Sequence, residues 1–328
     1  MSLYRFISNY ILFKFDPEMI HNLMQMILSS KLGSFFASFF ASDMNNESNT
    51  SLMGIELSSK ISLAAGFDKN CSMLNSLDKL GFGYIVGGTI TLNPRPGNQK
   101  PRIKRYIQQK SMINSLGFPN DGLTKIIDNL KKYKLKTPLI LSISGDSVKE
   151  ITQLYESLRD YCVGFEINIS SPNTEKLKFF HNNKNLSLLL SELNKIKTHP
   201  FMLKIPRFHD LENSEEKDKL IEFVEISIKY NVDGVVLSNT LPSEDSDLKI
   251  GKGGLSGKLL YKDTLNTIKI VNDLFKDKID LVASGGISNS QDVNYLVSNG
   301  AKSAQIWTAL IYEGPYLVKK INKELSCV

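Results

Sequence analysis

Two asparagines, two serines and a threonine follow directly after a short apolar run near the middle of the chain. The run is residues 163–167, Val-Gly-Phe-Glu-Ile, and the polar segment is residues 168–174, Asn-Ile-Ser-Ser-Pro-Asn-Thr. A run of this kind is typical of a buried strand, so Asn168 and Asn173 are expected at its end with the Ser171 hydroxyl between them. Amides both donate and accept hydrogen bonds, as a planar imide-like ligand requires, and a hydroxyl can remove a proton once it is activated. The segment therefore predicts a catalytic strand end.

Short apolar runs recur along the rest of the chain and alternate with longer amphipathic segments. Eight strand-like runs in this alternation predict an α/β protein, and a (β/α)8 TIM barrel rather than a doubly wound sheet. In such a barrel the residues just past each strand converge on one face, where catalysis takes place. The eight strands are expected at residues 61–65, 84–88, 138–143, 164–168, 201–205, 234–238, 280–284 and 303–307.

The residues just past these strands are nearly all polar or glycine. Besides residues 168–173, they are Asp68, Lys69, Thr89, Ser142, Lys204, Asn239, Thr240, Gly285, Gly286 and Thr308. Surface loops are polar in any case, so solvation alone explains any single one of them. Two isolated lysines and several asparagines on one rim, each behind apolar sequence, favour a binding site instead.

Two glycine-rich segments make different predictions. Gly285 and Gly286 follow the seventh expected strand, and barrels usually bind phosphate through backbone amides in the loops after strands 7 and 8. An ordinary tight turn is the alternative for such a pair. Residues 251–257 lack the pattern of a nucleoside-triphosphate loop and are expected to form a loop that does not directly follow a strand.

Composition excludes several classes of protein. The chain has 328 residues, 41% hydrophobic and 23% charged, so it can bury one large core. Its net charge of +6 is spread through lysine-rich helical stretches, whereas nucleic-acid binding needs a concentrated basic stripe. Cys71, Cys162 and Cys327 are widely spaced and fit no Cys/His metal pattern, which predicts a reducing compartment and no metal site.

The N-terminal 42 residues are too apolar for a solvated tail. Asp16-Pro17 is typical of a helix start, and Gly33 is expected to break this helix before a short second helix rich in phenylalanine. We therefore predict a helical pair in residues 1–42, an Asn- and Ser-rich linker over 43–56, and the barrel over 57–328. Two interpretations of the pair stay open, namely helices that brace the barrel and a membrane-docking pair around the mouth for a lipophilic ligand.

The chain carries no sign of a membrane-spanning or exported protein. No stretch of about 20 apolar residues is free of charge, and the first ten residues lack the pattern of a secretory signal. Any membrane contact is therefore expected to be peripheral.

Several short motifs occur in a fixed order along the chain. They are residues 63–70 (Leu-Ala-Ala-Gly-Phe-Asp-Lys-Asn), 88–91 (Gly-Thr-Ile-Thr), 94, 96–98 and 101–102 (Pro, Pro-Gly-Asn and Pro-Arg), 113–114, 117–118, 168–174, 238–240, 253–257 and 285–287. In this order they are similar to the motifs of the dihydroorotate dehydrogenases, the flavin enzymes of pyrimidine synthesis. The resemblance covers essentially the whole chain, and it is specific because many unrelated motifs coincide.

The resemblance implies an FMN laid across the mouth of the barrel. Its phosphate is expected near Gly257, Gly285, Gly286 and Thr308. Its ring is expected near Ala65, Gly66, Thr89 and Lys204. The same resemblance adds four further candidate contacts to the flavin, at Ser142, Asn168, Ser238 and Trp307.

The resemblance also implies that dihydroorotate or orotate stacks on the flavin. The expected substrate contacts are Lys69, Asn114, Asn168, Asn173, Asn239 and Thr240. Lys69 can neutralise the substrate carboxylate, and amides can satisfy both imide edges through paired hydrogen bonds. Oxidation requires removal of a proton from C5 and transfer of a hydride from C6 to the flavin.

Ser171 stands where the family has its catalytic base. Members that use soluble acceptors usually have cysteine there, whereas the membrane-linked, quinone-using class has serine. A serine hydroxyl is too weak a base unassisted, so the resemblance implies a relay of bound water past Thr174 and Phe118. The quinone class also has a two-helix membrane extension that residues 15–18 and His21 resemble.

In that class His21 and Arg102 would border the quinone tunnel; a surface histidine and a structural arginine are the alternatives. Three departures from the family pattern bear on these sites. Ser142 stands where an asparagine usually contacts the flavin, residues 117–120 replace an asparagine-rich version, and Trp307 stands where tyrosine is usual at the tunnel.

Quinone-dependent dihydroorotate oxidation at the cytoplasmic face of a membrane is our leading hypothesis, with an organelle as the less favoured location. A second hypothesis keeps the same half-reaction but passes electrons to a partner iron–sulfur flavoprotein and on to NAD. A third, from a different class, is a non-catalytic membrane-bound barrel, which predicts a colourless protein.

Overall fold

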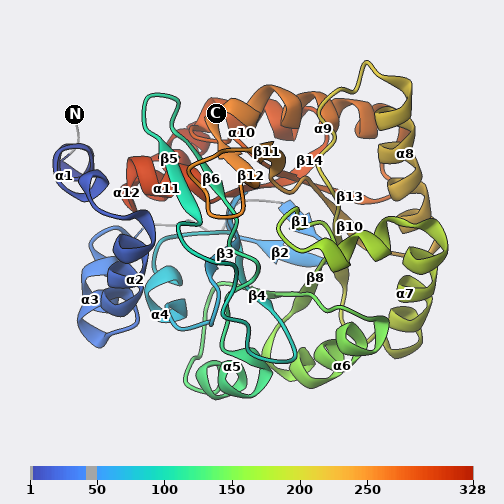
Figure 1. Ribbon diagram of the computed structural model, residues 1–328, viewed down its shortest axis with the longest axis horizontal. Coiled ribbons are helices and arrows are strands. Elements are labelled where there is room, and N and C mark those ends of the chain that lie inside the picture. Colours follow the sequence, from blue (N-terminus) through green and yellow to red (C-terminus); the bar gives the residue numbers. More distant parts are fainter. Residues whose placement is uncertain (1–2, 42–49, 328) are drawn as a thin grey trace.

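Eight parallel strands close into a barrel in the computed structural model, which describes residues 3–41 and 50–327 (Figure 1). Around the barrel the order is β10, β13, β14, β3, β4, β7, β8 and β9, and β9 pairs back to β10. Their bounds are β3 Ile61–Asp68, β4 Ile85–Ile90, β7 Leu139–Ile143, β8 Gly164–Asn168, β9 Phe201–Lys204, β10 Gly234–Leu237, β13 Asp280–Ser284 and β14 Ala301–Ile306. Each of the eight overlaps an expected strand, which confirms the (β/α)8 TIM barrel.

The strand β3 runs on to Asp68 instead of ending at residue 65. The buried Asp68 carboxylate accepts the backbone N–H groups of Ser72 and Met73 at 2.8 and 2.7 Å. We expected Asp68 on the catalytic rim, but it holds the turn that follows the strand.

Amphipathic helices cover the outside of the barrel. In α7 (Asn183–Ile196) the buried residues Leu186, Leu189, Leu190 and Leu193 recur every three or four positions, and Asn182 caps the first turn by accepting the Lys184 N–H. The other helices are α4 Leu74–Leu77, α5 Gly122–Leu130, α6 Val148–Leu158, α8 Ser214–Lys229, α9 Tyr261–Phe275, α10 Ser290–Ser298, α11 Thr308–Glu313 and α12 Tyr316–Leu325, with 3-10 turns η1 Leu12–Lys14, η2 Arg159–Tyr161, η3 Glu175–His181 and η4 Lys258–Leu260.

A hairpin lies at the amino-terminal end of the barrel strands, where we had expected only a linker. It consists of β1 (Thr50–Leu52) and β2 (Ile55–Leu57), and its Leu52 and Leu57 side chains are buried with the barrel residues Val86, Ile140, Met202, Val236 and Val282. The backbone N–H of Met53 donates to the Asp280 carboxylate at 2.6 Å. Residues 50–57 are therefore part of the barrel core; the rest of the expected linker, residues 43–49, lies outside the described residues.

A small antiparallel sheet lies beside the opposite end, in the order β11, β12, β6, β5. Its strands are β5 Ile103–Tyr106, β6 Ser111–Asn114, β11 Leu241–Glu244 and β12 Lys252–Gly257. Our expectation of a loop over residues 251–257 was wrong, because β12 pairs with both β11 and β6. The glycines allow this close approach: a Cβ on Gly254 would lie 2.0 Å from Thr240 Oγ1.

The N-terminal region contains the two expected helices, α2 (Pro17–Leu28) and α3 (Lys31–Ser38), and a further helix, α1 (Leu3–Tyr10). Asp16 caps α2 as predicted, by accepting the Met19 N–H at 2.8 Å. The prediction that Gly33 breaks the helix was wrong, since the chain turns at residues 29–30 and Ser30 caps α3 by accepting the N–H of Gly33. Glycine is needed there because a Cβ would lie 2.0 Å from the Ile27 carbonyl oxygen.

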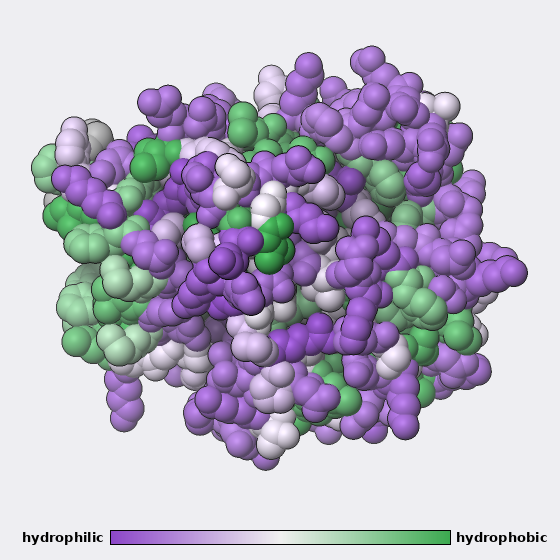
Figure 2. Space-filling model, in the orientation of Figure 1, coloured by the Kyte–Doolittle hydropathy of each residue, from purple (hydrophilic) through white to green (hydrophobic). Residues whose placement is uncertain are grey.

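These helices lie together on one side of the barrel, away from α7 and α8 (Figure 1). Of the 21 large apolar side chains that are exposed in the described residues, 12 belong to residues 6–39. Figure 2 shows a green area over α1–α3. The 12 side chains are Phe6, Tyr10, Ile11, Phe15, Met19, Leu23, Met26, Ile27, Leu32, Phe35, Phe36 and Phe39, which we call the N-terminal apolar face.

The N-terminal helices α1–α3 pack on the barrel and also expose this apolar face. Bracing of the barrel and docking on a membrane therefore do not exclude each other. No helix within the described residues combines the length and apolarity required to cross a bilayer.

Candidate active site

A cleft of about 1390 Å3, open mouth included, lies at the carboxyl ends of the barrel strands. Eighteen of the predicted site residues line it. They are Ala65, Gly66, Lys69, Thr89, Asn114, Phe118, Asn168, Ser171, Asn173, Lys204, Ser238, Asn239, Thr240, Gly257, Gly285, Gly286, Trp307 and Thr308. The residues predicted for substrate, flavin ring and phosphate thus share one cavity. Thr174, Ser142, His21 and Arg102 are not among its lining residues.

The asparagines of the cleft are tied to one another. Asn239 donates through Nδ2 to Asn168 Oδ1 at 3.3 Å, and Asn168 donates through Nδ2 to Thr89 Oγ1 at 3.1 Å. Asn173 donates to the Oδ1 of Asn114 at 3.2 Å, while its own Oδ1 is buried with no partner among the described residues. That oxygen is an acceptor available to a ligand N–H group.

Ser171 faces the cleft without an evident base. Its Oγ accepts only a long bond of 3.3 Å from the Asn173 N–H, and no described carboxylate or imidazole hydrogen-bonds to it. The Thr174 hydroxyl is buried and lacks a partner among the described residues. Phe118 has a φ of 57°, a left-handed conformation that few non-glycine residues adopt, and Asn120 Nδ2 donates to its carbonyl at 2.8 Å.

Glycines form the end of the cleft that was predicted for the phosphate. A Cβ on Gly286 would lie 2.3 Å from the Tyr261 nitrogen, and a Cβ on Gly257 would lie 2.5 Å from the Lys110 carbonyl oxygen. Gly285 has a φ of 128°, and a Cβ there would lie 2.3 Å from the buried Arg207 guanidinium. Glycine is therefore needed at these positions by the packing of neighbouring protein atoms, and all three glycines also line the cleft.

Arg207 stands directly behind this loop. Its Nε donates to the Asn239 carbonyl at 2.8 Å and its Nη2 to the Ser284 carbonyl at 2.6 Å, so it joins two strand ends of the cleft. Burial lowers the pKa of Arg207 to about 10 and outweighs the opposite effect of Asp263, and Nη1 has no partner among the described residues. The guanidinium still carries its charge at neutral pH.

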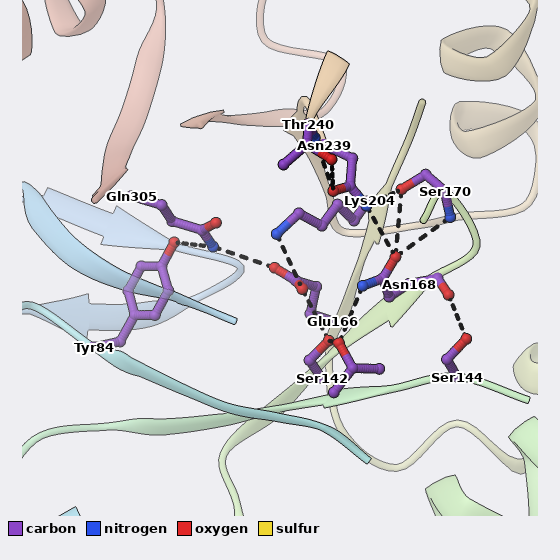
Figure 3. Close-up of polar contacts among 11 residues, drawn as sticks. Tyr84, Ser142, Ser144, Glu166, Asn168, Ser170, Lys204, Asn239, Thr240 and Gln305 are labelled. Atoms are coloured by element: carbon purple, nitrogen blue, oxygen red, sulfur yellow. Dashed lines mark hydrogen bonds and ion pairs between the residues drawn. The ribbon is translucent and has the colours of Figure 1, made fainter. Parts of the chain in front are cut away.

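A buried polar cluster forms the floor of the cleft (Figure 3). The Glu166 carboxylate accepts the Ser142 hydroxyl at 2.9 Å and the Gln305 amide at 3.3 Å, and Lys204 Nζ lies 3.5 Å away. Ser142, predicted to contact the flavin, lies below the lining residues and bonds to Thr89 Oγ1 at 2.9 Å. The buried Gln305 Oε1 and Ser238 Oγ have no partner among the described residues. Both residues line the cleft, so their free atoms suit a polar flavin ring.

Lys69 and His21 meet where α2 reaches the cleft. Their Nζ and Nε2 atoms are 3.3 Å apart, and the His21 ring stacks against Trp307 at 6.4 Å between centroids. Burial, reinforced by Lys69, lowers the pKa of His21 to about 3, so the ring is neutral and Nε2 accepts from the ammonium while Nδ1 keeps the proton. Burial also lowers the pKa of Lys69 to about 8, in spite of the nearby Asp68 and Glu18 carboxylates.

Arg102 attaches the same helix to the rim. Its Nη2 and Nε donate to the Glu18 carboxylate at 2.7 and 3.1 Å, and its Nη1 donates to the carbonyls of Pro96 and Asn98. All three guanidinium nitrogens are thus engaged within the protein. This geometry supports the structural alternative for Arg102, and its contact with quinone stays a prediction.

Sequence reasoning missed Lys110, Lys258, Ser256 and Gln305, which also line the cleft. Lys110 lies in the turn between β5 and β6 and does not follow a barrel strand in the sequence, so spacing gave no signal for it. The buried Glu166 did leave one, since it is a charged residue between Phe165 and Ile167 in its strand, whereas Gln305 follows Lys302 and Ser303 in β14 and did not stand out. No group of residues suited to a metal ion occurs in the described part of the chain.

Comparisons with known proteins agree with this geometry. The family model for dihydroorotate dehydrogenase matches residues 48–328. A relative from Coxiella burnetii, named dihydroorotate dehydrogenase (quinone), is 32% identical, and the match covers 99% of this chain and 97% of the relative. A protein of the same name from Christiangramia forsetii is also 32% identical, with 98% of both chains covered.

Solved structures give the same result. The dihydroorotate dehydrogenase of Eimeria tenella in complex with ferulenol superposes with a TM-score of 0.81 at 25% identity, over 94% of this chain and 90% of that chain. The strand order, the cleft and the sequence match together show that this chain belongs to the dihydroorotate dehydrogenase family of flavin-dependent oxidoreductases.

Proposed function

We propose that this chain oxidises dihydroorotate to orotate in pyrimidine synthesis, with FMN as its flavin and a quinone as electron acceptor. The observation that carries the proposal is the convergence of Lys69 and the amides of Asn114, Asn168, Asn173 and Asn239 in one cleft at the barrel mouth. A cation and four amides suit a ligand with one carboxylate and two imide edges. Relatives that are named quinone-dependent dihydroorotate dehydrogenases support the choice of substrate and acceptor.

The residues of the cleft have separable roles in this reaction. Lys69 is charged at neutral pH and binds the substrate carboxylate. The Asn173 Oδ1 atom, which has no partner within the described part of the chain, accepts an imide N–H. Ser171 removes the C5 proton, which leaves through bound water past Phe118 and past the Thr174 hydroxyl, which has no partner among the described residues. When bound, the flavin supplies the acceptor for the C6 hydride.

Gly257, Gly285, Gly286 and Thr308 would hold the FMN phosphate, because all four line the same cleft and Arg207 adds positive charge next to Gly285. Lys204 and Gln305 would contact the ring. The Gln305 Oε1 atom lacks a partner among the described residues and would gain one from a ring N–H group.

The N-terminal apolar face is proposed to dock on the cytoplasmic face of a membrane. An apolar surface of this size is costly in water, and helices of this kind lie in the bilayer interface. His21 and Trp307 stand where these helices meet the cleft, so a quinone entering from the bilayer would reach them. The neutral His21 keeps an Nδ1 proton with which it can donate to a quinone oxygen.

The test separates the two half-reactions. The purified protein should be yellow, should release FMN on denaturation, and should bleach when dihydroorotate is added without oxygen. Reoxidation by decylubiquinone should then be fast, and reoxidation by NAD should be slow. A colourless protein, or one that dihydroorotate does not bleach, would contradict the proposed activity.

A partner iron–sulfur flavoprotein is the remaining alternative for the acceptor. Bleaching by dihydroorotate with slow reoxidation by every quinone tested would favour it. In that case the N-terminal apolar face would be the docking surface for the partner protein.

A further inference from the structure

A buried carboxylate lies beneath the cleft, and none of the roles above uses it. Glu166 is fully buried in β8 and is not among the residues that line the cleft. A buried charge is costly unless it is both paired and hydrogen-bonded. Glu166 meets both conditions through Lys204, Ser142 and Gln305 (Figure 3).

The hydrogen bonds around Glu166 have a fixed direction. An ionised carboxylate only accepts, so the Ser142 proton must point to Glu166 and the Ser142 oxygen must accept from the Thr89 hydroxyl. Thr89 Oγ1 in turn accepts from Asn168 Nδ2, and Asn168 Oδ1 accepts from Asn239 Nδ2. The charge of Glu166 therefore fixes which edge the amides of Asn168 and Asn239 present to the cleft.

Lys204 connects the same carboxylate with the cleft itself. Its side chain is 6% exposed and lines the cleft, and its Nζ pairs with Glu166. At this burial a carboxylate directly behind the ammonium cancels part of the positive field that the ammonium projects into the cleft. A flavin ring in the cleft would therefore be exposed to the field of the Lys204–Glu166 pair and not to that of an unpaired lysine.

We propose that Glu166 is a positioning residue. It holds Lys204 and the hydrogen-bonded amides of Asn168 and Asn239 in place, and it keeps the reduction potential of the bound flavin low. A bare Lys204 cation would stabilise the negative charge of a reduced flavin, whereas the pair stabilises it less. The Glu166–Lys204 pair therefore lets the reduced flavin pass its electrons on more readily than Lys204 alone would. This inference rests on the FMN binding proposed above.

The test compares the reduction potential of the bound flavin in four proteins: wild type, Glu166→Gln, Lys204→Met and the double variant. Glu166→Gln keeps the shape of the side chain and should shift the equilibrium about tenfold toward reduced flavin. Such a shift equals about 30 mV for a two-electron couple.

In the Lys204→Met background the same Glu166→Gln change should shift the potential less, because no ammonium remains whose field the carboxylate offsets or whose position it holds. An unchanged potential in Glu166→Gln, or an equal shift in both backgrounds, would overturn the inference.

Ser142→Ala is the matched control, because it cuts the hydrogen-bond chain and leaves the ion pair in place. It should weaken orotate binding several-fold and leave the flavin potential unchanged, whereas Glu166→Gln should change both. A potential shift in Ser142→Ala equal to that in Glu166→Gln would show that the ion pair is not responsible.

Two further measurements keep the outcomes distinct. If Glu166→Gln yields no folded flavoprotein, Glu166→Asp replaces it as the test. The shorter side chain moves the carboxylate away from Lys204 and should raise the potential by a smaller amount. No shift in Glu166→Asp would overturn the inference. A wild-type protein that binds no flavin, or that dihydroorotate does not reduce, contradicts the proposed function. Normal reduction with identical potentials in wild type and Glu166→Gln contradicts only the role of Glu166.

Discussion

The mouth of the barrel and the N-terminal helices differ in which side chains they bury and which they expose. At the mouth, buried polar groups bond to one another, as in the chain from Asn239 through Asn168 and Thr89 to Glu166. In α1–α3 polar side chains such as Glu18 attach the helices to the barrel, while large apolar side chains remain in solvent. The mouth is organised before a ligand arrives, whereas the helices present a surface that only a partner can cover.

The largest expected effect belongs to the mouth. Ser171→Ala should slow flavin reduction by dihydroorotate by about 10²–10⁴-fold, because it removes the proposed base and leaves the amides in place. Anaerobic stopped-flow absorbance of the flavin measures this rate, and FMN content and orotate affinity serve as controls that should stay near wild type. Ser171→Cys should keep part of the rate with a lower pH optimum, since a thiol ionises more readily. Full-speed reduction in the alanine variant would remove Ser171 from the mechanism.

A comparable effect is expected at the apolar face, but on membrane binding alone. The triple change Phe35→Ser, Phe36→Ser and Phe39→Ser should weaken binding to phospholipid vesicles about 10²-fold, because each exposed ring loses roughly 1 kcal/mol or more of transfer energy. Flavin reduction should be unchanged. Leu188→Ser and Leu274→Ser form a matched control, because these residues are also about half-exposed but lie on the barrel. Equal loss of vesicle binding in both sets would show that the N-terminal face has no special role.

Lys69→Met tests the residue at which the two regions meet. Orotate affinity should fall roughly 10- to 100-fold, because a carboxylate in a partly dry site loses its cation. In wild type the affinity should also fall as pH rises through about 8, because burial lowers the pKa of Lys69 to that value and only the ammonium pairs with a carboxylate. Titrations of orotate from pH 6 to 9.5 would reveal both effects. A pH dependence that survives in Lys69→Met would assign it to another group.

The smallest effect is expected at the attachment of α2. Burial by itself raises the pKa of Glu18, but Arg102 and Lys100 lower it more, so the carboxylate stays charged until the pH falls below its usual value of 4.5. The ion pair is thus intact at neutral pH and is lost only as acid protonates Glu18. Glu18→Gln should raise the quinone KM a few-fold at pH 7 and leave flavin reduction unchanged. A slower reductive step would mean that the attachment also shapes the mouth.

The sequence was most informative where chemistry and strand ends coincide. Alternating runs located all eight barrel strands, and the residues just past them mostly line one cleft. The order of the motifs then led to predictions of the role of each residue, which the spacing of strands alone does not give. The misses follow from long-range packing: the 251–257 segment pairs in a sheet because β6 lies beside it, and nothing local indicates that neighbour.

Local signals were also overridden at Gly33 and near residue 50. A glycine after an apolar helix resembles a helix end, yet Gly33 lies inside α3 because its missing side chain lets α2 approach. The residues after the Asn- and Ser-rich stretch resemble a linker, but Leu52 and Leu57 fill the end of a barrel whose strands lie far ahead in the sequence. Neither contact could be inferred from neighbouring residues.

The span of the N-terminal contacts has a consequence for biosynthesis. Arg5 of α1 pairs with Glu313, which is 308 residues further along the chain, and Met53 bonds to Asp280, 227 residues further along. The apolar helices are therefore translated long before the surface on which they dock. During that interval their phenylalanines and methionines lack a protein partner, which exposes the nascent chain to aggregation. An early encounter with a membrane or a chaperone would protect this chain during its synthesis.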